Sequence, residues 1–174
     1  EPHDKIANGA SLFPFYAHWV TLENSGIDSI EDLKGKKINV GVKGQASHLI
    51  ANDILEVYGM SEDDLESVSF LNYGDAFQQL RDGRLDALFL QQDAPYSGFQ
   101  ELALTLGIKL LPIDEDKLIL LQQKNSGYIP SVINAGTYNG INYDVPTIET
   151  PISFVVSKEL PEQLIYDLIK ALDE

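Results

Sequence analysis

The chain has 174 residues, of which 44% are hydrophobic and 22% are charged, and its formal net charge is −15 at pH 7. This length allows a buried core without disulfides or metals, and it predicts one or two domains. The negative charge repels phosphate backbones and anionic lipid, so we expect no nucleic-acid partner and no peripheral membrane binding. Because cysteine is absent, thiolate zinc sites and cysteine nucleophiles are excluded.

No segment has the apolar length that a membrane-spanning helix requires. Residues 1–9 lack the basic and apolar regions of a signal peptide. If the protein is exported to a periplasmic or other extracytoplasmic location, we expect its signal peptide to have been removed.

The first predicted elements are a strand over residues 11–23, rich in aromatic and β-branched residues, and a short helix over residues 29–33. Strands and helices then alternate. We expect strands over 37–42, 67–71, 85–90 and 109–113, with helices over 45–58, 75–84 and 94–106 between them. This succession over residues 36–113 predicts an α/β fold with a mostly parallel sheet flanked by helices.

The helical periodicity over residues 45–58 predicts an inward face, formed by Leu49, Ile50, Ile54, Leu55 and Tyr58. After the last of those strands, a helix is expected over residues 114–124. Proline and glycine then interrupt a stretch of turns and extended chain. Residues 147–157 are β-rich, and the final helix begins near Pro161 with apolar residues at helical spacing.

The turn Gly41–Ser47 joins a predicted strand to a predicted helix, and it is the first candidate binding feature. The first amides of a helix have no acceptor within it and attract an anion, to which Ser47 and Lys43 would add a hydroxyl and a charge. The alternative is a turn that needs glycine for its geometry alone. It matches neither a P-loop nor a dinucleotide fingerprint.

The second candidate feature is Leu90–Pro95, where an apolar strand ends in polar side chains before a helix. Ligands of open α/β sheets gather at such strand ends. Gln92 has both a donor and an acceptor for a polar ligand. Asp93 either holds an ammonium group or caps the helix expected at Ala94, and the sequence favours the cap.

No catalytic constellation is recognisable in the sequence. His3, His18 and His48 are scattered, without the spacing of metal ligands, so we expect no metal and no cofactor. The many carboxylates occur in runs that are typical of solvent-exposed helix starts, and no acid/base pair can be singled out among them. We therefore expect a protein that is not an enzyme.

Several runs resemble a known family of receptors. Asp32–Gly41 resembles the segment that enters the second lobe of type II periplasmic binding proteins. Ile133–Gly140, Asp144–Thr147 and Leu160–Glu162 resemble the TAXI subfamily, which serves tripartite ATP-independent periplasmic (TRAP) transporters; Ser11–Pro14, Asp86–Phe89 and Lys170–Leu172 fit the same pattern.

The resemblance implies a two-lobed receptor that closes on a small-molecule ligand and delivers it to TRAP membrane subunits. It implies that residues 1–22 are a crossing strand and a remnant of lobe one, that 23–150 form lobe two, and that 151–174 return to lobe one. The ligand wall would comprise Gly44, Gln45, Ala46, Ser47, Gln92 and Asp93, with Phe13, Pro14 and Tyr16 near the lobe crossing.

This chain departs from the family at the candidate ligand wall. Members commonly have Gly-Ser-Gly-Thr where this chain has Gly44–Ser47, and small residues in place of Gln92 and Asp93. Because Asp93 disfavours an adjacent anion, a zwitterionic, cationic or polar neutral ligand is more credible than a plain dicarboxylate. The ligand class expected is an amino acid or a carboxylate-like solute.

Members of the family also extend beyond both ends of this sequence, so we expect a fragment with one complete lobe and part of the other. Apolar surface left uncovered would favour a homodimer or strand exchange. Two alternatives to transport remain: a ligand-sensing extracytoplasmic domain of a signalling protein, and an enzyme or cytosolic effector domain on the same two-lobed architecture.

Overall fold

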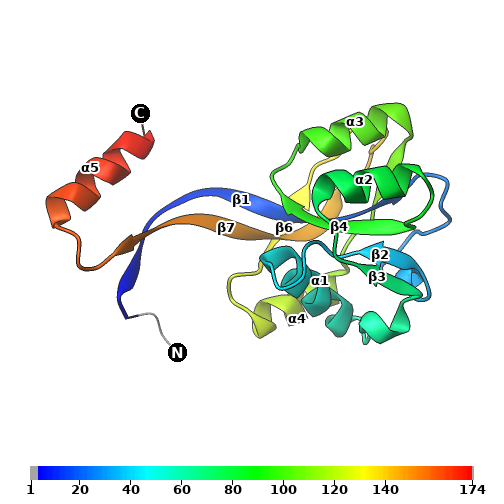
Figure 1. The fold of residues 1–174 in the computed structure, drawn as a ribbon, viewed down its shortest axis with the longest axis horizontal. Coiled ribbons are helices and arrows are strands. Elements are labelled where there is room, and N and C mark those ends of the chain that lie inside the picture. Colours follow the sequence, from blue (N-terminus) through cyan, green and yellow to red (C-terminus); the bar gives the residue numbers. More distant parts are fainter. Residues whose placement is uncertain (1–3, 174) are drawn as a thin grey trace. The chain divides into compact units, whose positions relative to one another are not determined.

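The computed structural model describes residues 4–173, which form two compact units (Figure 1). The larger unit is Phe15–Thr150, and the smaller unit comprises residues 4–14 and 151–173. His3 lies outside the described residues. The assignment of these parts to two lobes stays a prediction.

The strands have the following bounds: β1, Ile6–Leu22; β2, Lys37–Asn39; β3, Ser67–Ser69; β4, Ala87–Gln92; β5, Ile108–Leu110; β6, Ile129–Ile133; β7, Val145–Ser157. The expected strand over 85–90 therefore begins and ends two residues later. The strand expected over 37–42 stops at Asn39, because the chain turns at Gly41 with a φ of 82°. The strand at 109–113 shortens to Ile108–Leu110.

The sheet is mixed, with the order β3-β2-β4-β1-β7-β6, and β5 also pairs with β1. β2 is parallel to β3 and β4, whereas β1 is antiparallel to β4 and β5. β2, β3, β4 and β5 thus run in one direction, as the β-α-β succession predicts, and β1 is inserted between β4 and β5 in the opposite direction. The α/β fold class with a helix-flanked sheet is confirmed.

The helices of the larger unit are α1 (Ala46–Val57), α2 (Tyr73–Arg81), α3 (Ser97–Thr105) and α4 (Glu115–Lys124), with short 3₁₀ helices at Glu31–Leu33 and Glu62–Asp64. Figure 1 shows α1 and α4 on one face of the sheet and α2 and α3 on the other. No helix within residues 4–173 is long and apolar enough to cross a membrane.

Each face of the sheet has its own hydrophobic core. Trp19 and Phe89 pack with 4.9 Å between ring centroids on the face that α1 and α4 cover. Leu88, Leu90 and Phe99 are fully buried on the face that α2 and α3 cover. Because strand side chains alternate between faces, neighbouring residues of β4 belong to different cores.

One predicted inward residue of α1 is exposed. Ile50, Ile54 and Leu55 are buried as expected, but Leu49 is 57% exposed. The apolar stripe of α1 is therefore narrower than its periodicity predicted: it runs through Ile50, Ala51, Ile54 and Leu55, and Leu49 lies beside it on the helix surface.

The smaller unit contains the outer parts of β1 and β7 and helix α5, Glu162–Asp173. The amide of Lys158 donates to the carbonyl of Lys5, and the side chain of Phe154 lies against Gly9. Its apolar side chains are largely exposed, including Leu12, Val155, Leu164, Tyr166 and Leu172.

Candidate functional site

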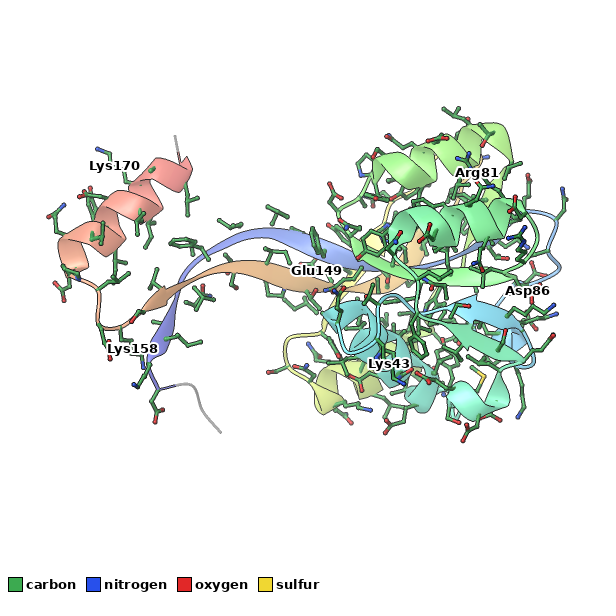
Figure 2. All side chains as sticks on the ribbon, in the orientation of Figure 1. Lys43, Arg81, Asp86, Glu149, Lys158 and Lys170 are labelled. Atoms are coloured by element: carbon green, nitrogen blue, oxygen red, sulfur yellow. The ribbon has the colours of Figure 1, made fainter. Side chains whose placement is uncertain are left out.

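Two candidate segments lie at the same edge of the larger unit's sheet. β2 and β4 are parallel neighbours with Asn39 opposite Leu88, so the turn after β2 and the segment after β4 both lie at the carboxyl edge. Figure 2 shows Glu149 and Asp86 at opposite ends of this sheet; Asp86 directly precedes β4 and therefore marks the amino edge. The carboxyl edge is where open α/β sheets bind ligands.

The turn after β2 brings a serine hydroxyl against the backbone. Gly41 has a φ of 82°, and a Cβ atom built on it would lie 2.3 Å from the hydroxyl oxygen of Ser47. Ser47 is the second residue of α1 and is 5% exposed. Only glycine at position 41 gives both the left-handed backbone and the space for this hydroxyl.

The beginning of α1 has unused hydrogen-bond donors. Gln45 precedes the helix and makes no capping bond with its side chain. Within the described part of the chain, the amides of Ala46, Ser47 and His48 and the hydroxyl of Ser47 have no acceptor. This cluster of donors has the geometry and the helix dipole that favour a carboxylate or another anionic group.

His48 holds this turn in place, a role that sequence reasoning missed. Its Nδ1 accepts the amide of Gly44 at 3.0 Å, so the ring proton lies on Nε2, which donates to Glu62 at 2.8 Å. Asn52 also donates to Glu62, at 3.0 Å. The exposed fraction of the His48 side chain is only 12%. A glycine four residues before a helical histidine was the available signal.

The Glu62 carboxylate is stabilised in its charged form. Desolvation alone would raise the pKa of Glu62, but the hydrogen bonds from His48 and Asn52, together with the charge of Lys43, lower it. The Lys43 ammonium lies 5.0 Å from the centroid of the Phe70 ring, as a cation–π pair at the same turn. Figure 2 labels Lys43 next to α1.

The two glutamines at the end of β4 lie on opposite faces of the sheet, and only Gln92 was a predicted site residue. Gln92 is opposite Tyr16 in the register and shares the face of Leu90 and α3, whereas Gln91 shares the face of Phe89 and α1. Gln91 donates to the hydroxyl of Thr150. Gln91 is thus the glutamine on the side of Ser47, and the period-two alternation along β4 would have indicated it.

Asp93 does not cap α3, which corrects the expectation for this residue. The helix begins at Ser97 rather than Ala94, and the residue before it is Tyr96. Pro95 disfavours a helical conformation at Ala94, so the chain cannot enter the helix there. Asp93 is exposed and free to meet a ligand cation.

A small aromatic group surrounds the segment that follows Asp93. The rings of Tyr73 and Tyr96 lie 6.4 Å apart and those of Phe77 and Tyr96 lie 6.1 Å apart. Desolvation, together with the charges of Tyr73 and Asp93, raises the pKa of Tyr96. The segment therefore combines a carboxylate with half-buried phenol rings, an arrangement that suits an ammonium or guanidinium group.

The remaining predicted site residues are divided between the units. Tyr16 is half-buried in the larger unit, directly opposite Gln92. Phe13 and Pro14 belong to the smaller unit. Among residues 4–173, no group of three or more histidine, aspartate or glutamate side chains has an arrangement that could hold a metal ion.

The amino edge of the sheet has a hollow of about 330 Å³, far from these segments in the topology. Glu23, Asp28, Lys109 and Tyr143 contribute its polar groups. The Lys109 ammonium already bonds to Asp28 and to the carbonyl of Ile27, at 3.2 Å from the latter. The Lys109 ammonium group, which is the cationic group of this hollow, is therefore already paired.

Solved structures with the same fold are periplasmic binding proteins. An ABC transporter periplasmic binding protein from Brucella ovis with glutathione bound matches with a TM-score of 0.57 and 14% identity, over 99% of this chain and 42% of its own. A putative periplasmic sulfonate-binding protein from Methylobacillus flagellatus KT matches with 0.56 and 15%, over 98% and 42%. An ancestral arginine-binding protein bound to arginine matches with 0.56 and 20%, over 97% and 57%.

At these sequence identities the structures establish the fold alone, which is that of type II periplasmic binding proteins. The chain spans only about half the length of each of these proteins. The NMT1-like family model matches residues 1–174, the whole of the sequence. The chain therefore belongs to the NMT1-like family.

Proposed function

We propose that this chain is part of an extracytoplasmic solute-binding protein, which captures a small polar organic solute for a membrane transporter without converting it chemically. The observation that carries the proposal is the cluster of unpaired donors at the start of α1, formed by three amides and the Ser47 hydroxyl at the carboxyl edge of the sheet.

The ligand class follows from the two segments at this edge. The donors around Ser47 suit a carboxylate, and the exposed Asp93 beside the ring of Tyr96 suits an ammonium or guanidinium group. An amino acid carries both groups, whereas a dicarboxylate would place a second negative charge near Asp93. We therefore favour a zwitterionic amino acid, which agrees with the arginine in one structure of the same fold.

Binding is tested by thermal unfolding and calorimetry of the chain, and of any longer natural form, against amino acids, dicarboxylates and polyamines. A ligand that binds only the folded state raises the melting temperature by mass action. No saturable shift with any compound, or turnover of a bound compound, would contradict the proposal.

A serine pair gives the site-specific control. Ser47→Ala removes a hydroxyl that has no partner within residues 4–173, so the free energy of unfolding without ligand should change little. With ligand bound, the variant loses a hydrogen bond to a charged ligand group, which contributes about 1.5–3 kcal/mol to the binding free energy. This corresponds to a loss of affinity of about 10- to 100-fold. Ser67→Ala makes the same change at the amino end of β3, where serine is exposed, and should leave affinity unchanged.

The membrane partner is the finer part of the proposal. The sequence runs that resemble TAXI receptors favour TRAP membrane subunits, whereas the Brucella ovis structure is described as an ABC transporter component. Uptake in reconstituted vesicles separates the two: a TRAP partner requires an ion gradient, and uptake that requires ATP but no gradient would assign an ABC partner.

We also propose that the smaller unit mediates self-association of this chain. Val155 on β7 is 50% exposed and Tyr166 on α5 is 62% exposed, and Leu164 and Leu172 on α5 are 43% and 47% exposed. Sedimentation should show a concentration-dependent dimer that weakens in the double variant Leu164→Ser, Tyr166→Ser. A strictly monomeric species at high concentration would contradict this part.

A further inference from the structure

His18 is a buried, titratable side chain whose contacts lead to the second candidate segment. The residue is 1% exposed, and its ring centroid lies 5.1 Å from that of Phe99 and 5.9 Å from that of Tyr138. Nδ1 lies 3.0 Å from the carbonyl oxygen of Tyr16, and Nε2 lies 3.0 Å from the Tyr138 hydroxyl. Both ring nitrogens are therefore engaged.

The partners determine where each proton lies. A carbonyl oxygen only accepts, so Nδ1 of His18 carries the proton and donates to Tyr16. In the neutral ring Nε2 is an acceptor, so the Tyr138 hydroxyl donates to it. The same hydroxyl oxygen accepts the amide of Tyr96 at 3.0 Å. The result is one directed series of hydrogen bonds, from Tyr96 through Tyr138 and His18 to Tyr16.

Both ends of this series lie at the segment Gln92–Tyr96. The Tyr96 amide is the last before α3 begins, three residues after Asp93. At the other end, Tyr16 is opposite Gln92 in the pairing of β1 with β4. Tyr138 comes from a distant turn and is 1% exposed, so it has no alternative solvent partner.

We propose that neutral His18 and Tyr138 are positioning residues that hold Gln92–Tyr96 in its binding conformation, and that protonation of His18 in acid releases this segment. The inference rests on the proposed function, since it concerns the same site, and it adds a pH response to that site.

The release follows from the position of the Tyr138 hydroxyl proton. When His18 is protonated, Nε2 becomes a donor, so this hydroxyl loses its acceptor and must turn its proton toward the other side of the oxygen, from which the Tyr96 amide donates. Burial lowers the pKa of His18 to about 4, against smaller raising contributions from hydrogen bonds to the backbone of Tyr16 and Leu90. The release therefore belongs to acidic conditions.

The side chains that contact His18, which are Phe99 and Tyr138, do not titrate in acid. Phe99 of α3 is uncharged, and Leu90 of β4 interacts through its backbone. Burial raises the pKa of Tyr138 to about 12, with a lesser raising contribution from the charge of Asp93. Asp93 is the carboxylate that acts on both Tyr138 and Tyr96.

The test compares Tyr138→Phe with Tyr128→Phe by NMR amide exchange. The control also removes a buried tyrosine hydroxyl, one that donates to Asp53 on α1. In the unmodified chain at pH 7 the Tyr96 amide should be protected, and Tyr138→Phe should accelerate its exchange at least about tenfold, while Tyr128→Phe should not. The ring nitrogen shifts of His18 should report the Nδ1–H tautomer.

The same two variants are then titrated with L-arginine at pH 7 and near pH 4. If the binding conformation is populated only one-tenth of the time, the apparent Kd rises about tenfold. We expect this tenfold rise in the apparent Kd for Tyr138→Phe at pH 7. We expect the same rise for the unmodified chain over the pH range in which the NMR signal of His18 titrates. Tyr128→Phe should bind as the unmodified chain does at both pH values.

Equal exchange and equal affinity of the two variants would overturn the inference, as would titration of His18 without any change at Tyr96. Failure of the solute-binding proposal looks different. In that case the unmodified chain binds neither arginine nor any compound of the panel, while the exchange of Tyr96 still shows whether Tyr138 and His18 hold the segment.

Discussion

The two units of this chain differ sharply in how they bury apolar side chains. In Phe15–Thr150, Trp19 and Phe89 are at most 1% exposed between a mixed sheet and its helices. In the smaller unit, Val155 is 50% exposed and Tyr166 is 62% exposed. Because apolar burial is the main stabilising term, the free energy of folding should reside almost entirely in the larger unit.

The largest expected effect breaks the core of the larger unit. Phe89→Ala removes a fully buried ring that packs on Trp19, which should cost about 3–5 kcal/mol in the free energy of unfolding. Tyr166→Ala, in the smaller unit, should cost less than about 0.5 kcal/mol. Urea unfolding of both variants measures the contrast, and similar losses would show that stability is shared.

The next effect concerns pH and again belongs to the larger unit. The pKa of His18 is about 4 in the folded chain, against an ordinary histidine value of 6.5, so the unfolded chain binds the proton first as pH falls. The stabilisation is present above pH 6.5 and is lost progressively toward pH 4, by about 3 kcal/mol in total. His18→Asn should flatten this part of the pH profile of urea unfolding; an unchanged slope would contradict it.

A smaller effect distinguishes two glycines of the same turn. Gly41 and Gly44 have φ values of 82° and 81°, so alanine at either position should cost about 1–2 kcal/mol in backbone strain. Gly41→Ala also collides with Ser47, whereas Gly44→Ala meets nothing within 4 Å. We expect an additional loss of about 1–3 kcal/mol for Gly41→Ala, measured by urea unfolding. Equal losses would refute the close approach of Ser47.

The smallest effect concerns the His48 contact. Glu62→Gln keeps the shape of the side chain but weakens the bond from His48, so we expect a loss of about 0.5–1.5 kcal/mol. Amide exchange at Gly44 should accelerate in this variant. Glu66→Gln, whose carboxylate is in an exposed pair with Lys37, is the matched control and should show neither change.

Local patterns predicted the helices and strands of the larger unit well. The periodicity placed α1 within one residue of its observed ends, and the expected helix over 114–124 corresponds to α4. The apolar run of β4 was recognised, although its bounds shifted. These elements were predictable because their own residues determine which side is buried.

The arrangement around the site depends on contacts that local patterns do not contain. His18 and Tyr138 are 120 residues apart in sequence, and His48 of α1 contacts Glu62 at the start of the next 3₁₀ helix. β1 lies antiparallel between β4 and β5, which a β-α-β succession does not predict. The start of α3 at Ser97 follows from Pro95, a local signal that was available.

The central claim is that solute binds at the carboxyl edge of the larger unit's sheet. The most direct measurement is an NMR titration of the isotope-labelled chain with the compound that gives the largest thermal shift. The account predicts amide shift changes concentrated at residues 44–48 and 91–96. Changes concentrated instead at the hollow near Lys109 and Tyr143, or spread over the smaller unit alone, would contradict it.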